Sequence, residues 1–212
     1  MNDAPSREPF VLLGIGLLCL VISGIEPFDY LTWVEEVFPA VAGALILLAL
    51  SRRFRFTPLV YRLVFVHALI LMLGGHYSYA RVPLGYWAQE LFHFTRNHYD
   101  RVGHFAQGFV PAMIAREVLL RCTPLRRGGW LFFLVVSVCL AFSAFYEFTE
   151  WWTSLIEGAR ATDFLGTQGD PWDTQWDMFM AFSGSILAQL LLSRAHDRQL
   201  ARMTGGDSVK AL

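Results

Sequence analysis

The sequence predicts an all-α polytopic membrane protein, a bundle of about six transmembrane helices with a short interfacial helix on its outer face. The 212 residues are 55% hydrophobic and have a mean hydropathy of +0.41, more apolar surface than a soluble domain of this length could bury. Charged residues make up 17%, below the roughly 25% usual in soluble domains. The basic residues also cluster beside alternate apolar segments, as they do in membrane proteins.

Six apolar segments have about the length of a membrane-spanning helix, which needs roughly 20 residues. We predict spans at Pro9–Ile25, Val34–Leu50, Pro58–Gly75, Gly103–Leu120, Trp130–Trp152 and Asp177–Ser193. The fourth segment is the most polar, since it contains His104, Arg116 and Glu117. It is still assigned as a span because the charge pattern of the loops requires a crossing there.

That charge pattern is an excess of arginine in alternate connections, which marks cytoplasmic loops. Of 17 basic residues, 13 lie at the N-terminus, in the second and fourth connections and in the C-terminal tail: Arg7, Arg52, Arg53, Arg55, Arg62, Arg116, Arg121, Arg126, Arg127, Arg194, Arg198, Arg202 and Lys210. The other connections carry Arg81, Arg96, Arg101 and Arg160. The prediction is a multi-pass protein of the bacterial inner membrane with both termini in the cytoplasm.

Aromatic residues gather at the predicted outer boundaries, where amphipathic rings favour the headgroup layer. Between positions 84 and 97, Leu84, Trp87, Leu91 and Phe94 share one helical face. This spacing predicts an interfacial helix on the outer leaflet, with a loop packed on the bundle as the alternative.

The chain is expected to form one transmembrane domain, 1–202, followed by a disordered cytoplasmic tail, 203–212. The first segment is interpreted as an uncleaved helix, with a cleaved signal peptide as the alternative. His196 is assigned to the tail, and His67 to ordinary packing. The three cysteines do not suggest a disulfide framework, and the scattered basic clusters do not suggest nucleic acid.

Polar residues recur at helical spacing near the outer ends of three predicted spans. They are Asp100, His104 and Gln107 in the fourth, Ser143, Glu147 and Glu150 in the fifth, and Asp173 and Asp177 at the start of the sixth. Ionisable groups at membrane depth are costly, so they normally face the bundle interior and pair with each other or with a cation. The inner half of the bundle is expected to be nearly all apolar.

Carboxylates combined with imidazole suit manganese, zinc or iron, and such a metal could activate water or polarise a phosphoryl oxygen. The candidate ligands are Asp100, His104, Glu147, Glu150, Asp173 and Asp177. The candidate catalytic residues are Asp100, His104, Glu147 and Asp177, and Arg101, Arg96 and Gln107 are the candidate substrate-binding residues. The alternative is that these groups are interhelical hydrogen-bonding partners, with Arg101 as counter-ion and Asp173 as a helix cap.

Three stretches carry a family resemblance: Asn97–Phe105, Ser143–Trp151 and Gly166–Met178. In these motifs, and over nearly its whole length, the chain resembles the YjdF-like family of bacterial inner-membrane proteins. The resemblance implies a location and a topology rather than a reaction.

A more distant similarity is to VanZ-like membrane proteins, a group linked to glycopeptide antibiotic resistance. Their pattern begins Asp-Lys-x-x-His, which Asp100, Arg101 and His104 match with arginine in place of lysine. A later glutamate of the pattern corresponds to Glu147 or Glu150. Their Asp-x-x-x-Asn-x-x-Gly helix matches at Asp177 and Gly184, but Ala181 replaces the asparagine. This similarity implies cell-envelope, lipid-linked substrates.

Three functions follow from the sequence as hypotheses. The first is an outer-face enzyme, with a divalent metal as its cofactor, acting on a lipid or lipid-linked substrate. The second is a non-catalytic assembly or envelope-stress factor in which the polar cluster holds helices together. The third is a small proton-coupled transporter, which would need polar groups through the full thickness of the bundle.

Overall fold

The computed structural model describes residues 7–157 and 167–203. In these ranges the chain is helical throughout: α1 (Glu8–Ser23), α2 (Tyr30–Leu50), α3 (Pro58–Tyr77), the 3-10 turn η1 (Tyr79–Arg81), α4 (Pro83–Phe92), α5 (Tyr99–Cys122), α6 (Gly129–Glu157) and α8 (Asp173–Met203). Each of the six predicted spans overlaps one helix, and α1 is the shortest of the six at 16 residues. The predicted tail, apart from Met203, lies outside the described residues.

Local sequence signals explain where several helices begin. The Asp29 carboxylate accepts a hydrogen bond from the Thr32 amide at the start of α2. Thr57 caps α3 through the Val60 amide, and Pro58 occupies the first turn. A side-chain acceptor before the helix and a proline in its first turn are common start signals, because the first amides of a helix have no partner within it.

Four of these helices, α2, α3, α6 and α8, are long and apolar enough to cross a membrane, and α1 is a shorter apolar helix. Helix α5 is too polar to meet the same criterion on its own. The structure therefore supports a polytopic helical bundle, and the number of six crossings stays a prediction that depends on α5.

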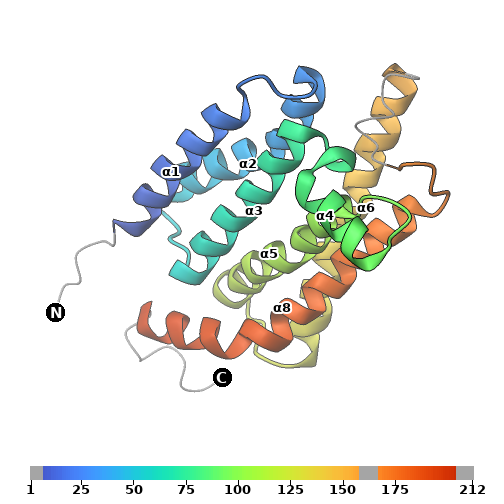
Figure 1. The fold of residues 1–212 in the computed structure, drawn as a ribbon. Coiled ribbons are helices and arrows are strands. Elements are labelled where there is room, and N and C mark those ends of the chain that lie inside the picture. Colours follow the sequence, from blue (N-terminus) through green and yellow to red (C-terminus); the bar gives the residue numbers. More distant parts are fainter. Residues whose placement is uncertain (1–6, 158–166, 204–212) are drawn as a thin grey trace.

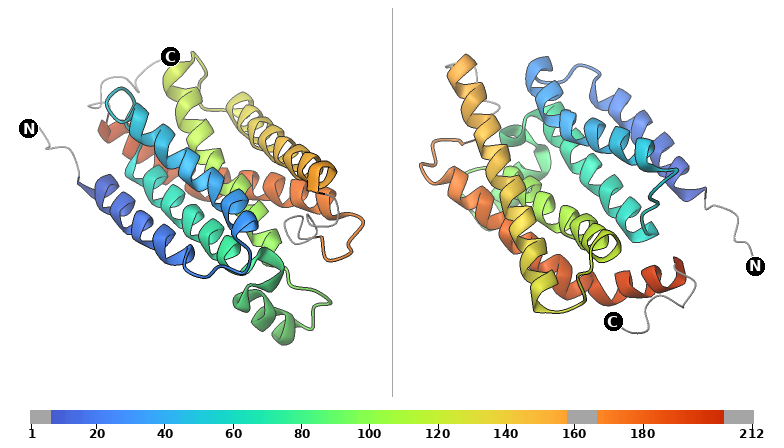
Figure 2. Two further views of the ribbon diagram at one scale, coloured as in Figure 1. Left: turned by 90° about the horizontal axis from the view of Figure 1, so that it is seen from above. Right: turned by 180° about the vertical axis from the view of Figure 1, so that it is seen from behind.

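The helices run alternately up and down, so the start of α1 and the end of α8 lie at the same end of the bundle (Figure 1). Helix α5 lies at the centre and packs against α3, α6 and α8. Helices α1, α2 and α3 form one side, and α6 and α8 the other (Figure 2). The apolar core lies around the middle of α5 and includes Ala112, Met113, Val135, Cys139 and Ala188.

Small residues bring α5 and α8 into backbone contact. A Cβ atom added to Gly108 would lie 1.8 Å from the carbonyl oxygen of Ala181, and one added to Gly184 would lie 2.2 Å from that of Phe105. Ala181 and Ala188 lie on the same face of α8 as Gly184, and both are fully buried. This contact brings the polar ends of the two helices within side-chain reach of each other.

The prediction of a nearly apolar inner half is wrong. The fully buried Glu117 carboxylate accepts hydrogen bonds from the amide and hydroxyl of Thr57, from Arg121 and from His196. His196 is also fully buried, between Glu117 and Arg116, so its assignment to the tail is wrong as well. His196 is buried because α8 continues to Met203 and its last turns cross beneath the bundle (Figure 1).

The predicted short helix after the third span exists as α4. It ends at Phe92, and His93 follows in the left-handed conformation. Leu84, Trp87 and Leu91 are each more than half exposed. Because this segment is a helix with an exposed apolar face, the alternative prediction of a loop packed on the bundle is wrong. The position of α4 on the outer leaflet remains a prediction.

Candidate functional site

A loop anchored by side chains holds the start of α5 beside the start of α8. The Gln168 side chain donates to the Asn97 carbonyl at 2.8 Å and accepts from the Asn97 amide at 3.2 Å. The Asn97 side chain in turn accepts from the Tyr99 amide and donates to the Val82 carbonyl. Gly85 must be glycine here, because its Cβ would lie 1.7 Å from the Asn97 side chain.

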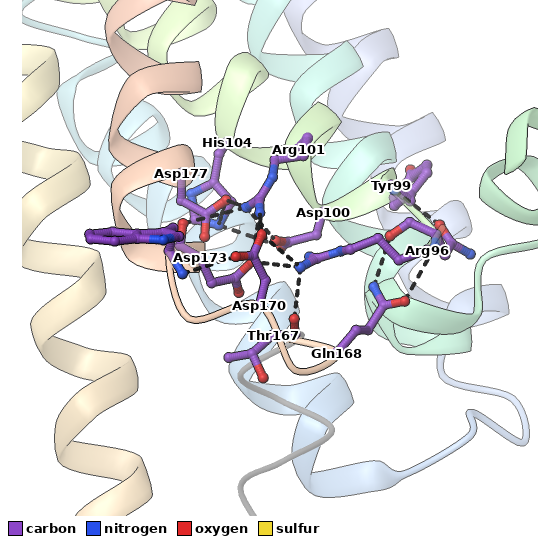
Figure 3. Close-up of polar contacts among 12 residues, drawn as sticks. Arg96, Tyr99, Asp100, Arg101, His104, Thr167, Gln168, Asp170, Asp173 and Asp177 are labelled. Atoms are coloured by element: carbon purple, nitrogen blue, oxygen red, sulfur yellow. Dashed lines mark hydrogen bonds and ion pairs between the residues drawn. The ribbon is translucent and has the colours of Figure 1, made fainter. Parts of the chain in front are cut away.

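Two arginines cross from α5 and the residues just before it to three aspartates near the start of α8 (Figure 3). Arg101 contacts Asp173 at 2.7 Å and Asp170 at 3.2 Å, and it also pairs with Asp177. Arg96 contacts Asp173 at 3.0 Å. Carboxylates of the same chain therefore occupy both terminal nitrogens of Arg101 and the Nη1 of Arg96.

The ring of His104 lies between two groups of carboxylates. Its Nε2 faces Asp100 Oδ1 at 3.5 Å and Asp177 Oδ1 at 3.8 Å. Its Nδ1 faces Glu147 Oε1 at 3.9 Å. Ligand atoms of Asp100, His104 and Asp177 lie within 4.8 Å of one another, and so do those of His104, Glu147 and Glu150. Each set has the composition of a site for a divalent metal.

The two sets differ in how their charges are compensated. Asp177 pairs with Arg101, whereas Glu147 has only the imidazole of His104 as a cationic partner among the described residues. Thr174 lies near Glu147, yet neither Glu147 oxygen accepts a hydrogen bond of ordinary geometry. His104 Nδ1 and the Ser143 hydroxyl are likewise buried without a partner among the described residues. Buried polar atoms are normally paired, so these atoms mark a place where a partner is missing.

The candidate residues therefore fall into two neighbouring groups. Asp173 and Arg96 join the ion pairs beside Arg101. Asp100, His104, Glu147 and Asp177 lie together and are each at least 92% buried. His98 precedes α5, where burial and then the nearby Arg96 and Arg101 lower the pKa of its imidazole. The sequence places a further acidic residue, Asp163, in the loop before α8, and it lies outside the described residues.

A cavity of about 60 Å³ lies on the other side of His104 and Asp100, toward α2 and α3. Its walls include Gln107, His67, Tyr79, Tyr146 and Glu150. His67, which the sequence assigned to ordinary packing, therefore also lines a cavity. They also include Glu36 of α2, which is 94% buried.

Glu36 is missing from the residues predicted from the sequence. It lies next to Glu35, close to the predicted start of the second span, where a carboxylate is easily interpreted as a headgroup-level residue. The available signal was its position inside the second predicted span, nearly two turns after the start of α2, because ionisable residues within a span are functional candidates.

The fold and this site define a multi-pass helical membrane protein with a buried cluster of carboxylates and histidine. Residues 9–198 match the family described as predicted membrane protein (DUF2238), and the chain belongs to that family. It is 51% identical over 185 residues to the inner membrane protein YjdF of Escherichia coli (strain K12), covering 87% of this chain and 88% of that protein. No solved structure matches the chain. The protein is therefore a multi-pass protein of the inner membrane, as the resemblance implied.

Proposed function

We propose that this protein is a metal-dependent enzyme that acts at the outer face of the inner membrane on a lipid or lipid-linked envelope substrate. The observation that carries the proposal is the group of unpaired buried atoms around His104 Nδ1 and Glu147. Leaving such atoms without a partner costs about 1–3 kcal/mol each, more for a charged group, and a bound cation removes that cost.

The metal position that best fits these atoms is on the α6 side of His104. There His104 Nδ1, Glu147 and Glu150 supply one nitrogen and two carboxylates, and the Ser143 hydroxyl lies one turn before Glu147 on α6. On the opposite edge of the ring, Asp100 faces Nε2 and orients the imidazole, as carboxylates do for histidine ligands of metals.

A metal bound there would activate water or polarise an oxygen of the substrate. Glu150 lines the cavity as well as belonging to this ligand set, so a group bound in the cavity would lie next to the metal. Asp177, whose charge is compensated by Arg101, also lies on the Nε2 side and would help to keep the ring proton of His104 on Nε2, which leaves Nδ1 for the metal.

The position at the outer face rests on the distribution of arginine. The site lies at the end of the bundle where α5 and α8 begin and α6 ends, and most of the basic residues lie at the opposite end. Excess arginine marks the cytoplasmic side, so the site is assigned to the outer face and both termini to the cytoplasm.

A transport path through α5 is disfavoured by the core. Between Gln107 and Arg116 the helix rises about 14 Å, and over this length the core contains the fully buried Met113 of α5 and Val135 and Cys139 of α6. This apolar layer separates the outer cluster from the inner Glu117 cluster. Polar groups that carry an ion across a membrane need a continuous wet or proton-conducting route, which the layer interrupts.

The alternative with support of its own is a non-catalytic assembly or envelope-stress factor. Arg101 links α5 to Asp173 and Asp177 of α8, which is what residues that hold helices together do. This alternative expects substitutions in the cluster to lower protein abundance without any specific loss of metal.

The test is the metal content of the detergent-purified protein after loading with manganese, zinc or magnesium. We expect close to one metal ion per chain in the wild type, and at least a tenfold lower content in Glu147→Gln. Glu90→Gln makes the same chemical change at an exposed position of α4 and should keep the metal. A wild-type protein that retains no metal under any of these loadings contradicts the proposal, provided that the melting temperatures show all variants to be folded.

A further inference from the structure

The cavity beside His104 has walls from α2, α3, η1, α5 and α6, and its chemistry is strongly biased. Three carboxylates line it, those of Glu36, Asp100 and Glu150. No lysine or arginine does so among the described residues. The nearby guanidinium of Arg101 is directed to aspartates at the start of α8 instead (Figure 3).

This lining excludes an anionic ligand group. A phosphate or carboxylate placed in the cavity would face like charges with no arginine to neutralise it. A cationic amino group would instead find carboxylate acceptors on α2 and α6, and the rings of Tyr79 and Tyr146 in the same walls. The volume of about 60 Å³ suits a small group such as an ammonium with one or two carbons rather than a sugar.

Unsatisfied and buried polar groups in the wall also point to a ligand. Asp100 lines the cavity, is 92% buried, and its Oδ2 accepts no hydrogen bond from the described residues. Glu36 is buried to a similar degree and interacts with the Tyr79 hydroxyl, but it forms no ion pair among the described residues, and the positive charge that acts on it is that of the more distant His104. A carboxylate kept at this depth needs a compensating charge, which the ligand would supply.

The route into the cavity follows from which helices pack together. Helix α2 packs along α3, and α6 packs along α5 and α8. Seen from behind, α2 and α6 occupy the same face of the bundle, with α3 and α5 further back (Figure 2). Since α2 and α6 both line the cavity and each packs mainly on other helices, the way in from the bilayer lies between them.

We infer that this cavity is the subsite for a primary amino group of the substrate, with Glu36 as the residue that recognises it. A lipid whose headgroup ends in an amine would enter between α2 and α6 with its acyl chains left in the bilayer. This inference rests on the proposed function for the reaction next to the cavity, whereas recognition of the amine does not require the metal.

The test compares two lipids with the same acyl chains, one with an aminoethyl phosphate headgroup and the other its N-acetylated form. The purified full-length protein is exposed to both, and the retained lipid is measured by native mass spectrometry. The wild type should retain the amine about tenfold better, because a charge-assisted hydrogen bond to Glu36 is lost on acetylation. Equal retention of the two lipids would overturn the inference.

Variants assign the preference to Glu36. Glu36→Gln should abolish it, and Glu36→Asp, which keeps the charge and controls for folding, should restore part of it. Glu26→Gln, an exposed position beside the start of α2, should leave the preference unchanged. An undiminished preference in folded Glu36→Gln would also overturn the inference.

Two further measurements separate this inference from the metal proposal and identify the source of the amine. Metal content in the same samples should be unchanged in Glu36→Gln, and Glu147→Gln should lose metal but keep the lipid preference, so either proposal can fail alone. Displacement of the lipid by millimolar free ethanolamine would support a soluble amine as the ligand, and retention against it would support the lipid headgroup.

Discussion

Replacing Arg101 with methionine should destabilise the protein much more than a typical loss of an ion pair. The Arg101 side chain is only 10% exposed, and its partners Asp173 and Asp177 are 7% and 1% exposed. Breaking a buried pair by removing one partner costs about 3–5 kcal/mol, because it leaves the other charge buried without compensation. The contact with the more exposed Asp170 adds little.

The assay is reversible unfolding in mixed micelles, with the free energy of unfolding compared between variants. Arg62→Met serves as the control, because Arg62 is 60% exposed and its solvated pair with Glu8 should contribute far less than a buried pair. The double variant Arg101→Met, Asp177→Asn should be at least 1 kcal/mol more stable than the sum of the single losses predicts, since the second change removes the stranded carboxylate. Strictly additive losses would refute the reasoning that Arg101 compensates Asp177.

Three other predictions concern packing, the inner cluster and topology. Gly108→Ala should lower the free energy of unfolding by about 3 kcal/mol or more in the same assay, because the added Cβ would meet the backbone of Ala181. As the control, Gly43→Ala should change it by at most about 1 kcal/mol, because a Cβ there has no neighbour within 4 Å. Glu117→Gln should cost about 1.5–3 kcal/mol in that assay, through weaker charge-assisted hydrogen bonds, and no loss would contradict the buried network. A fluorescent protein fused after Met203 should be fluorescent in cells, and a periplasmic alkaline phosphatase fusion there should be inactive; the opposite result would refute the assigned orientation.

The positions of the helices were predictable because their signals are local. The lengths of the apolar segments predict the spans, and Thr57 followed by Pro58 is a sequence signal for the start of α3. The meeting of His104 with Asp177 was predictable too, since helical spacing places Asp100 and His104 on one face and the arginine pattern places the helix ends at one side of the bundle.

What the sequence could not show are contacts set by tertiary packing. Nothing local indicates that Arg101 faces the aspartates of α8 rather than a substrate phosphate, or that Glu36 reaches the same cavity as Glu150. Arg116 and Glu117 entered the sequence analysis only as polar residues of a span that the charge pattern required. The last span was expected to end at Ser193, whereas α8 continues to Met203 and buries His196 against Arg116. Hydropathy does not detect this polar extension of the helix.

The two buried networks tie α5 to α8 near both ends, through Asp177 at the outer end and through His196 at the inner end. This has a consequence for how the chain enters the membrane. Helix α5 emerges from the ribosome before Arg101 and Glu117 can meet their partners on α8. Charged groups at membrane depth disfavour partition of such a lone helix from the translocon into lipid. Stable insertion of α5 therefore waits for the synthesis of α8, and a chain truncated before α8 should leave α5 at the translocon or exposed to proteases.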